Sequence, residues 1–385
     1  MTKTTVTSLD KMNTTMYILY ETLNVSQTLV TSLVVSTDAS VIEMTKQLDR
    51  NGTRVHMSLL DIAYVTVTLL VSIMSILGCF VILIVHWLCP DLRTSGRNML
   101  VHLTIADLLT AIGNVFGVTW YLTIESLDYT MVYCYFHSAL TIMSSIASFL
   151  WTVVIAWFVF WILISMQLSF SKRQKGYTIL LPIVCWGVPA VIALSAVGLN
   201  VLGYDHNLSQ ASWCWINPEN EHALMWMFIS GKAWELGTCI STFCLYGAVK
   251  ILLFQQAKKR STLTSRTDRR TEKANIKLTF VPIVFLVIRI WGTIRFLIGC
   301  YAHEFASSSA ADWITILQGA GDSAQGFANF VMYIFTTKKI RHRIFYFCSG
   351  TNRDLVATGK SQYKRSCKAE GGQHGVHCIA KSFDE

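Results

Sequence analysis

The sequence predicts an all-α membrane protein, a bundle of seven transmembrane helices with the N-terminus outside. The 385-residue chain is 52% hydrophobic and only 14% charged, whereas soluble domains carry about 25% charged residues. Seven runs are long and apolar enough to cross a bilayer, and lysines and arginines gather in alternate connections between them. Backbone polar groups must be bonded internally in lipid, so these runs are expected to be helices.

The spans differ in how apolar they are. A spanning helix requires about 20 mostly apolar residues, and the first span, which contains IAYVTVTLLVSIMSILG, is continuously apolar. The second, fifth and seventh are the most polar. We expect helices over residues 62–88, 98–122, 134–166, 177–200, 223–254, 275–301 and 313–336. This odd number of crossings places the two termini on opposite sides of the membrane.

Basic residues in the connections orient the bundle. Segments 123–133, 201–222 and 302–312 contain no Lys or Arg, whereas the four alternate segments contain 17 in total. Short loops rich in Lys and Arg remain in the cytoplasm. The N-terminus is therefore expected outside and the C-terminus inside.

Four N-x-[ST] glycosylation sequences agree with this orientation. Each is a weak signal alone, but all fall on the expected outer side, at Asn13, Asn24, Asn51 and Asn207. Residues 1–60 are rich in Ser and Thr and contain no cysteine, so they lack the disulfides that usually support a small extracellular domain. We interpret them as a glycosylated, mostly flexible tail, although residues 16–48 have some helical periodicity.

Two of the eleven cysteines are predicted to form a disulfide. Cys134 lies at the outer end of the third span, and Cys214 lies in the next outer loop, within SWCWINP. Both face an oxidising compartment, where disulfides persist. Such a bridge would hold that loop over the mouth of the bundle. The alternative is that both thiols are free, with Cys300 as a competing partner at the same end.

The seventh span carries polar side chains in a regular row. Gln318, Asp322, Gln325 and Asn329 are spaced i, i+4, i+7 and i+11, and Tyr333 continues the row. Positions with this spacing share one helix face. Polar and ionisable groups in a membrane span usually face the bundle interior or a watery cavity. We therefore expect the row to line an internal network rather than to face lipid.

Charged residues of the fifth and sixth spans are candidates for the same network. Lys232 and Glu235, at i and i+3, are neighbours on a helix face, and Arg289 lies near the middle of the sixth span. We expect these three residues, with Gln318 and Asp322, to line an outward-opening cavity. Two interpretations stay open: the side chains contact a ligand, or they form internal ion pairs that fix helix packing.

Two further polar features of the spans are Arg295 and a group of polar residues in the inner half of the bundle. Arg295 is six residues from Arg289 and therefore lies on a different face, so it is expected to extend outward to the membrane surface. Asp107 and Asn114, seven residues apart on the second span, share a face. With Gln325, Asn329 and Tyr333, these two residues make up an expected inner polar layer.

The C-terminal region is predicted to be cytoplasmic. Residues 337–348, TKKIRHRIFYFC, alternate basic with apolar side chains, which predicts a short amphipathic eighth helix at the membrane surface. Cys348 at its end is a candidate for palmitoylation, with a free thiol as the alternative. Residues 349–385 are rich in Gly, Ser and Lys, and we interpret them as a disordered tail.

Several stretches resemble G-protein-coupled receptors. CWGVPAVIAL at 185–194 is similar to the Trp-Gly-x-Pro region of secretin-like receptors, and LQGAGDSAQGFANFVMY at 317–333 resembles their Gln-Gly-containing seventh helix. SSIASFLWTVVIAW at 144–157 and RIWGTIRF at 289–296 are most similar to the cyclic-AMP-receptor-like branch, including a small group of orphan receptors between the two branches.

This resemblance implies a plasma-membrane receptor. It would pass the signal of an extracellular ligand to a heterotrimeric G protein at the cytoplasmic face through rearrangement of the bundle. The basic segment 255–277 would then be a docking site for the G protein, and the alternative is ordinary cytoplasmic charge attracted to anionic lipid. LTIADLL at 103–109 is similar to rhodopsin-like receptors, which suggests water or sodium in the inner layer, although a plain hydrogen-bonded layer is favoured.

The sequence also departs from these receptors. The Asp-Arg-Tyr of rhodopsin-like receptors is absent at the inner end of the third span, where the chain reads ILISMQLSF, and the cysteine-rich N-terminal domain of secretin receptors is missing. The second departure argues against a peptide hormone captured by such a domain.

Other functions of multi-span proteins fit less well. A retinal-binding pump needs a lysine in the seventh span, and residues 313–336 contain none. A membrane hydrolase needs metal ligands, whereas His102 and Asp107 lie on different faces of the second span. A transporter favours repeated halves with broken helices, and no clear internal repeat is found. We therefore expect a receptor without enzymatic activity, cofactor, metal or nucleic-acid partner, and keep a transporter that uses the intramembrane charges as the alternative.

Overall fold

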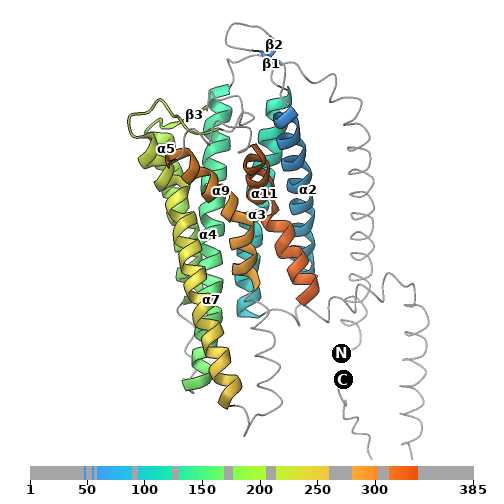
Figure 1. The fold of residues 1–385 in the computed structure, drawn as a ribbon, viewed down its shortest axis with the longest axis vertical. Helices are drawn as coiled ribbons and strands as arrows, with labels where there is room; N and C mark the ends of the chain where they lie inside the picture. The colour runs from blue at the N-terminus through green and yellow to red at the C-terminus, as the bar shows by residue number, and fades with distance from the viewer. Residues whose placement is uncertain are drawn as a thin grey trace, which may run out of the picture. The chain divides into compact units, whose positions relative to one another are not determined.

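The structure is a computed structural model (Figure 1). It describes residues 47–48, 54–55, 59–88, 94–123, 130–168, 177–204, 214–259, 280–301 and 312–336. The chain divides into two units, Met1–Tyr333 and Ile334–Glu385, and the description below concerns the first unit and the end of its last helix. Outside the described residues lie the four expected glycosylation sites, the expected eighth helix with Cys348, and the C-terminal tail: Asn13, Asn24, Asn51, Asn207 and residues 337–385.

Long helices form the bundle in the order expected from the sequence. They are α2 (Leu59–Leu88), α3 (Ser95–Thr123), α4 (Thr130–Leu168), α5 (Tyr177–Gly198), α7 (Ala233–Lys259), α9 (Phe280–Tyr301) and α11 (Asp312–Thr336). The fifth span is entered through the short helix α6 (Ala223–Met227) and a π-helix, η4 (Phe228–Lys232). Six spans of the described chain are long and apolar enough to cross a membrane by length and composition. The helix outside that group is α11, which carries the polar row.

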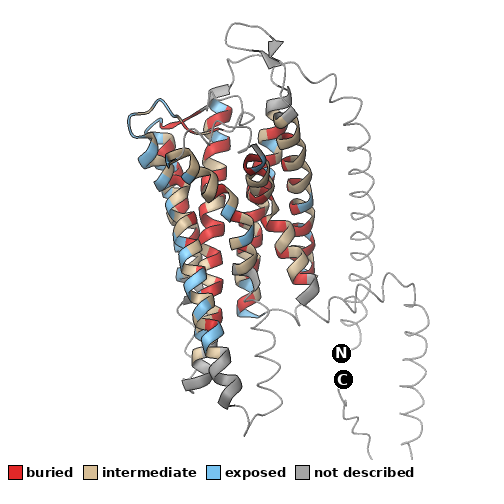
Figure 2. Ribbon diagram, in the orientation of Figure 1, coloured by how far each residue is buried: buried red, intermediate tan, exposed pale blue. Residues whose placement is uncertain are grey.

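Helix α4 is the centre of the packing. It contacts α3, α5, α7 and α9, and buried residues run along it in Figure 2. Several of these buried residues are small, among them Ser144, Ala147 and Ser148. Small side chains let transmembrane helices approach closely, which is how such helices associate without a hydrophobic driving force between them.

A β-hairpin covers one end of the bundle. Strands β3 (Leu202–Tyr204) and β4 (Cys214–Ile216) pair antiparallel. A disulfide joins Cys214 to Cys134 of α4, with 5.2 Å between their Cα atoms. The hairpin is therefore tied to the third span, and we call this the disulfide-bearing end. Cys300, the competing partner considered above, is a free thiol in the structure.

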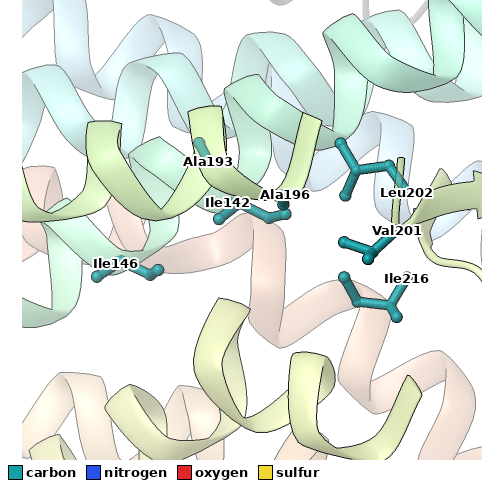
Figure 3. Close-up of a cluster of buried hydrophobic side chains, with 7 residues drawn as sticks. All are labelled: Ile142, Ile146, Ala193, Ala196, Val201, Leu202 and Ile216. Atoms are coloured by element: carbon teal, nitrogen blue, oxygen red, sulfur yellow. The ribbon is translucent and has the colours of Figure 1, made fainter. Parts of the chain in front are cut away.

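Apolar packing secures the hairpin as well. A buried cluster joins side chains of α4 and α5 to the hairpin and the residue before it (Figure 3). Its members are Ile142, Ile146, Ala193, Ala196, Val201, Leu202 and Ile216. The disulfide thus holds the hairpin to α4, and the apolar cluster holds it to α4 and α5.

The N-terminal segment contains one described element. Strands β1 (Gln47–Leu48) and β2 (Arg54–Val55) pair antiparallel, with Gln47 opposite Val55 and Leu48 opposite Arg54. The sequence predicted a mostly flexible tail over residues 1–60 and did not anticipate this pair. Two residues on each side give too little alternation for a sequence pattern to reveal a strand.

Glycines bring α11 close to its neighbours. A Cβ at Gly319 would lie 2.5 Å from both Tyr64 and Thr68 of α2. A Cβ at Gly321 would overlap the backbone carbonyl oxygen of Ile288 in α9. Backbone cannot move aside as a flexible side chain can. Gly321 is therefore the position at which the close approach of α9 and α11 most requires a residue without a side chain.

We expect Gly321→Ala to lower the free energy of unfolding by about 1–3 kcal/mol, because overpacking forces the two backbones apart. Gly299→Ala in α9 is the matched control: a Cβ there meets nothing within 4 Å, and Ala in a helix interior is favoured over Gly by about 1 kcal/mol. Thermal unfolding of the purified protein measures both. Equal effects of the two substitutions would show that the close approach at Gly321 is unimportant.

Candidate functional site

An ion pair on the fifth span faces the sixth. Lys232 Nζ lies 2.8 Å from Glu235 Oε2 and 3.4 Å from the carbonyl oxygen of Gly292 in α9. Thr293 Oγ1 donates a hydrogen bond of 2.6 Å to Glu235 Oε1. The ammonium also lies 5.6 Å from the centre of the Phe296 ring, within the range of a cation–π attraction. The two charges therefore tie the fifth span to α9.

A second ion pair joins the sixth and seventh spans. Arg289 Nη1 lies 2.8 Å from Asp322 Oδ1. Gln318 Nε2, one helical turn from Asp322 on α11, donates to Asp322 Oδ2 at 3.3 Å. The Arg289 guanidinium lies 5.1 Å from the Phe149 ring centre on α4. The side chain of Arg289 is 5% exposed and that of Asp322 is 21% exposed, so the carboxylate is the more accessible member of the pair.

Arg295 corrects one expectation. The sequence placed it on a different face from Arg289 and predicted that it would extend outward. Instead its Nη1 donates to Gln318 Oε1 at 2.9 Å. The reach of an arginine side chain explains the difference: from another face of α9 it still contacts the residue one turn from Asp322. Gln318 therefore bridges Arg295 and Asp322.

Gly292 lies beside the first ion pair and beside Gln318, which donates to the second. A Cβ on this residue would lie 3.5 Å from Glu235 Oε1 and 3.6 Å from both Lys232 Nζ and Gln318 Cγ. The structure thus brings the five expected network residues into one group across three helices. We call this group the ion-pair cluster; it consists of Lys232, Glu235, Arg289, Gln318 and Asp322.

Sequence reasoning missed Thr293 and Gly292 as partners of the ion-pair cluster. Thr293 lies four residues after Arg289, so the helical spacing places it on the same face. That spacing was the signal that could have identified it. Gly292 had no comparable signal, because a glycine contributes space and a carbonyl oxygen rather than a side chain.

The inner polar layer centres on Asp107, which is buried. Ser148 Oγ donates to Asp107 Oδ1 at 2.6 Å, and Asn329 Nδ2 donates to Asp107 Oδ2 at 2.8 Å. This joins α3, α4 and α11. The expected neighbours Asp107 and Asn329 are therefore in direct contact, whereas Ser148 was not anticipated, since a serine in an apolar span carries no distinctive pattern.

Asn114, the other expected member on α3, reaches α11 separately. Its Nδ2 donates to Ser323 Oγ at 2.9 Å. Ser75 Oγ of α2 donates to the Ser323 backbone carbonyl and accepts from the Phe327 amide at 3.1 Å. Asn114 and Asp107 thus share a helix face but contact different groups on α11.

Gln325 and Tyr333 differ from the rest of the row. Gln325 is 2% exposed, and within the described residues neither its Nε2 nor its Oε1 has a hydrogen-bond partner. Tyr333 is buried, and its ring centre lies 5.9 Å from the Arg97 guanidinium. Burying an unbonded amide costs about 1–3 kcal/mol, so Gln325 is the least satisfied of the polar side chains in the row.

His102 is placed apart from Asp107, as the helix faces predicted. Its ring stacks on Trp151 with 4.5 Å between ring centres, and Trp186 Nε1 donates to His102 Nδ1 at 3.5 Å. Among the described residues, no group of three or more His, Cys, Asp or Glu side chains is arranged to hold a metal ion.

Comparison with known proteins identifies the family. The sequence matches the family described as "7 transmembrane receptor (Secretin family)" over residues 57–328. It is 32% identical over 294 residues to "G-protein coupled receptor 157" of Mus musculus, covering 73% of this chain and 84% of that protein. The Homo sapiens protein of the same name is 31% identical over 292 residues, covering 73% and 83%.

The fold has a counterpart among solved structures. The crystal structure of squid rhodopsin aligns with a TM-score of 0.59, covering 75% of this chain and 85% of that one, at 14% sequence identity. At this identity the likeness concerns the fold alone. The match to the family covers most of the bundle, and the chain therefore belongs to the secretin family of seven-transmembrane receptors.

Proposed function

We propose that the ion-pair cluster is where this receptor recognises its ligand, and that the disulfide-bearing end is extracellular. Family membership makes the chain a multi-pass receptor of the plasma membrane and does not support the transporter alternative. The observation that carries the proposal is the grouping of two ion pairs from the fifth, sixth and seventh spans, linked by Gln318, which lies beside Gly292 and donates to Asp322. A charged ligand entering there would meet partners of both signs.

Ligand binding at this place would change the contacts between helices. Glu235 ties α7 to α9 through Thr293, and Asp322 ties α11 to α9 through Arg289. A ligand that replaces one of these partners binds the arrangement of α9 in which that contact is broken more tightly than the arrangement in which it is formed. Only such differential affinity can shift a conformational equilibrium. We propose that this shift opens the opposite end of the bundle to a heterotrimeric G protein.

The proposed G-protein site lies at the end of the bundle opposite the disulfide. The basic segment 255–277 begins within α7, which continues to Lys259, and its remaining residues lie outside the described part. Its positive charge suits an acidic partner surface and anionic lipid alike. Membership of the receptor family supports the interpretation that the segment binds an acidic partner surface.

Glu235→Gln is expected to raise basal guanine-nucleotide exchange about three- to tenfold. It replaces a hydrogen bond to a charged group, which contributes about 1.5–3 kcal/mol, by a neutral one of about 0.5–1.5 kcal/mol, and so removes about 1 kcal/mol from the state that contains it. Exchange is measured in cell membranes against a panel of G proteins, at equal surface expression. Glu219→Gln is the control, because Glu219 is exposed in the turn after β4. Loss of surface expression with unchanged exchange per receptor would instead indicate ion pairs that only fix packing.

Ligand contact is tested separately. A library of small amines, carboxylic acids and amino acids is screened in the same exchange assay. A compound that activates the receptor through the cluster should lose at least about tenfold in potency with Asp322→Asn, the loss of one charged partner. Its potency should be unchanged with Glu219→Gln. Activators equally potent on both variants would place the ligand elsewhere.

A further inference from the structure

The fifth span is interrupted by a π turn immediately before the ion-pair cluster. Residues Phe228–Lys232 form the π-helix η4 between α6 and α7, and its last residue is Lys232. A π turn holds one more residue than an α turn, is rare, and frequently lies at functional sites. The extra residue changes the register of everything before it relative to α7. The direction of Phe228, whose ring centre lies 5.3 Å from that of Phe296 in α9, therefore depends on this turn.

Specific contacts hold the π turn. The Ala233 amide bonds to the Phe228 carbonyl, five residues earlier. The Trp234 indole Nε1 donates to the Ile229 carbonyl at 2.9 Å, also five residues back. Ser230 is 2% exposed, and its hydroxyl has no hydrogen-bond partner within the described residues. The Trp234 indole thus replaces a backbone hydrogen bond that the Ile229 carbonyl would accept in an α turn. The Ser230 hydroxyl is buried without a partner, which costs free energy.

The hairpin contacts the π turn directly. Trp215 follows Cys214 on β4, and its Cζ2 lies 3.5 Å from the position of a Cβ on Gly231. Gly231 immediately precedes Lys232. Trp215 and Trp234 both pack against the buried cluster of Figure 3. A continuous series of contacts therefore runs from the disulfide through Trp215 to the residue beside Lys232.

We propose that Trp215 is a positioning residue, which holds the π turn in the register that keeps Phe228 against Phe296 of α9, the ring that lies beside Lys232. Displacing the hairpin lets the turn relax towards α-helical register. Loss of one residue from a turn rotates the preceding residues by about 100° relative to α7. Phe228, the first residue of the turn, then leaves the Phe296 ring, whose centre lies 5.3 Å from its own and 5.6 Å from Lys232 Nζ. The inference rests on the proposed function, because it gives a ligand contact with the hairpin a route to the ion-pair cluster.

A double-mutant cycle tests the route without a ligand. The purified full-length receptor is compared as wild type, Trp215→Ala, Glu235→Gln and the double variant, by thermal unfolding. Sites that do not share partners give additive effects, whereas sites coupled through a shared element do not. We expect the double variant to unfold within about 2 °C of the less stable single variant, a difference small against the several degrees expected of one lost contact.

Three further variants test the same route and provide a control. Trp215→Phe keeps a ring over Gly231 and should restore most of the unfolding temperature lost in Trp215→Ala. Deletion of Ile229 removes the extra residue, and its effect should not add to that of Glu235→Gln. Trp161→Ala, whose side chain is 49% exposed on α4, is the control and should add its effect fully to that of Glu235→Gln.

The outcomes separate the two proposals. Additive effects of Trp215→Ala and Glu235→Gln, no effect of Trp215→Ala, or additivity for the Ile229 deletion would each overturn the positioning role. If Trp215→Ala does not fold, the same cycle is read with Trp215→Phe and the Ile229 deletion. A coupled cycle together with unchanged nucleotide exchange in Glu235→Gln would retain the positioning role and reject the ion-pair cluster as the signalling site.

Discussion

Asp322→Asn is expected to lower the free energy of unfolding by about 3–5 kcal/mol, because it leaves a buried guanidinium without its counter-charge. The Arg289 side chain is 5% exposed, so little water is available to replace the lost partner. The amide oxygen of the introduced asparagine and the Phe149 ring offer only dipolar and cation–π attraction in place of the carboxylate. Thermal unfolding of the purified receptor measures the loss, and surface expression should fall with it.

Substitution of the other partner of the ion pair should lower the free energy of unfolding by a smaller amount. Arg289→Met leaves Asp322, which is 21% exposed and still accepts a hydrogen bond from Gln318. The order of the two effects therefore follows from the unequal exposure of the pair.

A neutral double variant provides the decisive comparison. Arg289→Met with Asp322→Leu removes both charges, and replacing a buried pair by apolar residues of similar volume is often neutral or stabilising. The double variant should recover most of the unfolding temperature but should lose response to any ligand that uses these charges. Lys250→Met, which removes an exposed cation of α7, controls for lost charge alone. A double variant as unstable as Asp322→Asn would contradict the explanation.

The polar row shows what the sequence could predict. Gln318, Asp322 and Asn329 share a face by spacing alone, and the structure joins each to a neighbouring helix or to the next member of the row. Spacing specifies which residues face inward, but it contains no information on which helix they meet. The partners Thr293 and Ser148 could not be chosen from sequence for that reason.

The fifth span shows where sequence reasoning ends. Its expected range, residues 223–254, begins where α6 begins, includes η4 and ends within α7, which continues to Lys259. The π turn within it follows no local signal, since FISGK is compatible with an ordinary α-helix. The turn is stabilised by Trp234 from one side and Trp215 from a loop elsewhere in the chain. Only tertiary contacts distinguish the two registers, so periodicity of the sequence could not.

Removal of the disulfide is expected to be the second large effect. Cys134 and Cys214 are separated by 80 residues, and closing a loop of that length restricts the unfolded chain, which typically stabilises a protein by about 2–4 kcal/mol. Because the spans between the two cysteines remain in the membrane, the unfolded chain is already restricted. We therefore expect the lower half of this range for the double variant Cys134→Ser, Cys214→Ser, measured by thermal unfolding without reductant.

The same variant also bears on the π turn. Without the disulfide, the apolar cluster of Figure 3 still holds β4 to α4 and α5, so the hairpin loosens rather than detaches. Trp215, next to Cys214, would then press less firmly on Gly231, and basal nucleotide exchange should change in the same direction as in Glu235→Gln. Cys300→Ser, which removes a free thiol, should leave both measurements unchanged. A disulfide variant that loses stability but keeps wild-type exchange would show that the hairpin is anchored for folding alone, because its movement would then have no path to Lys232.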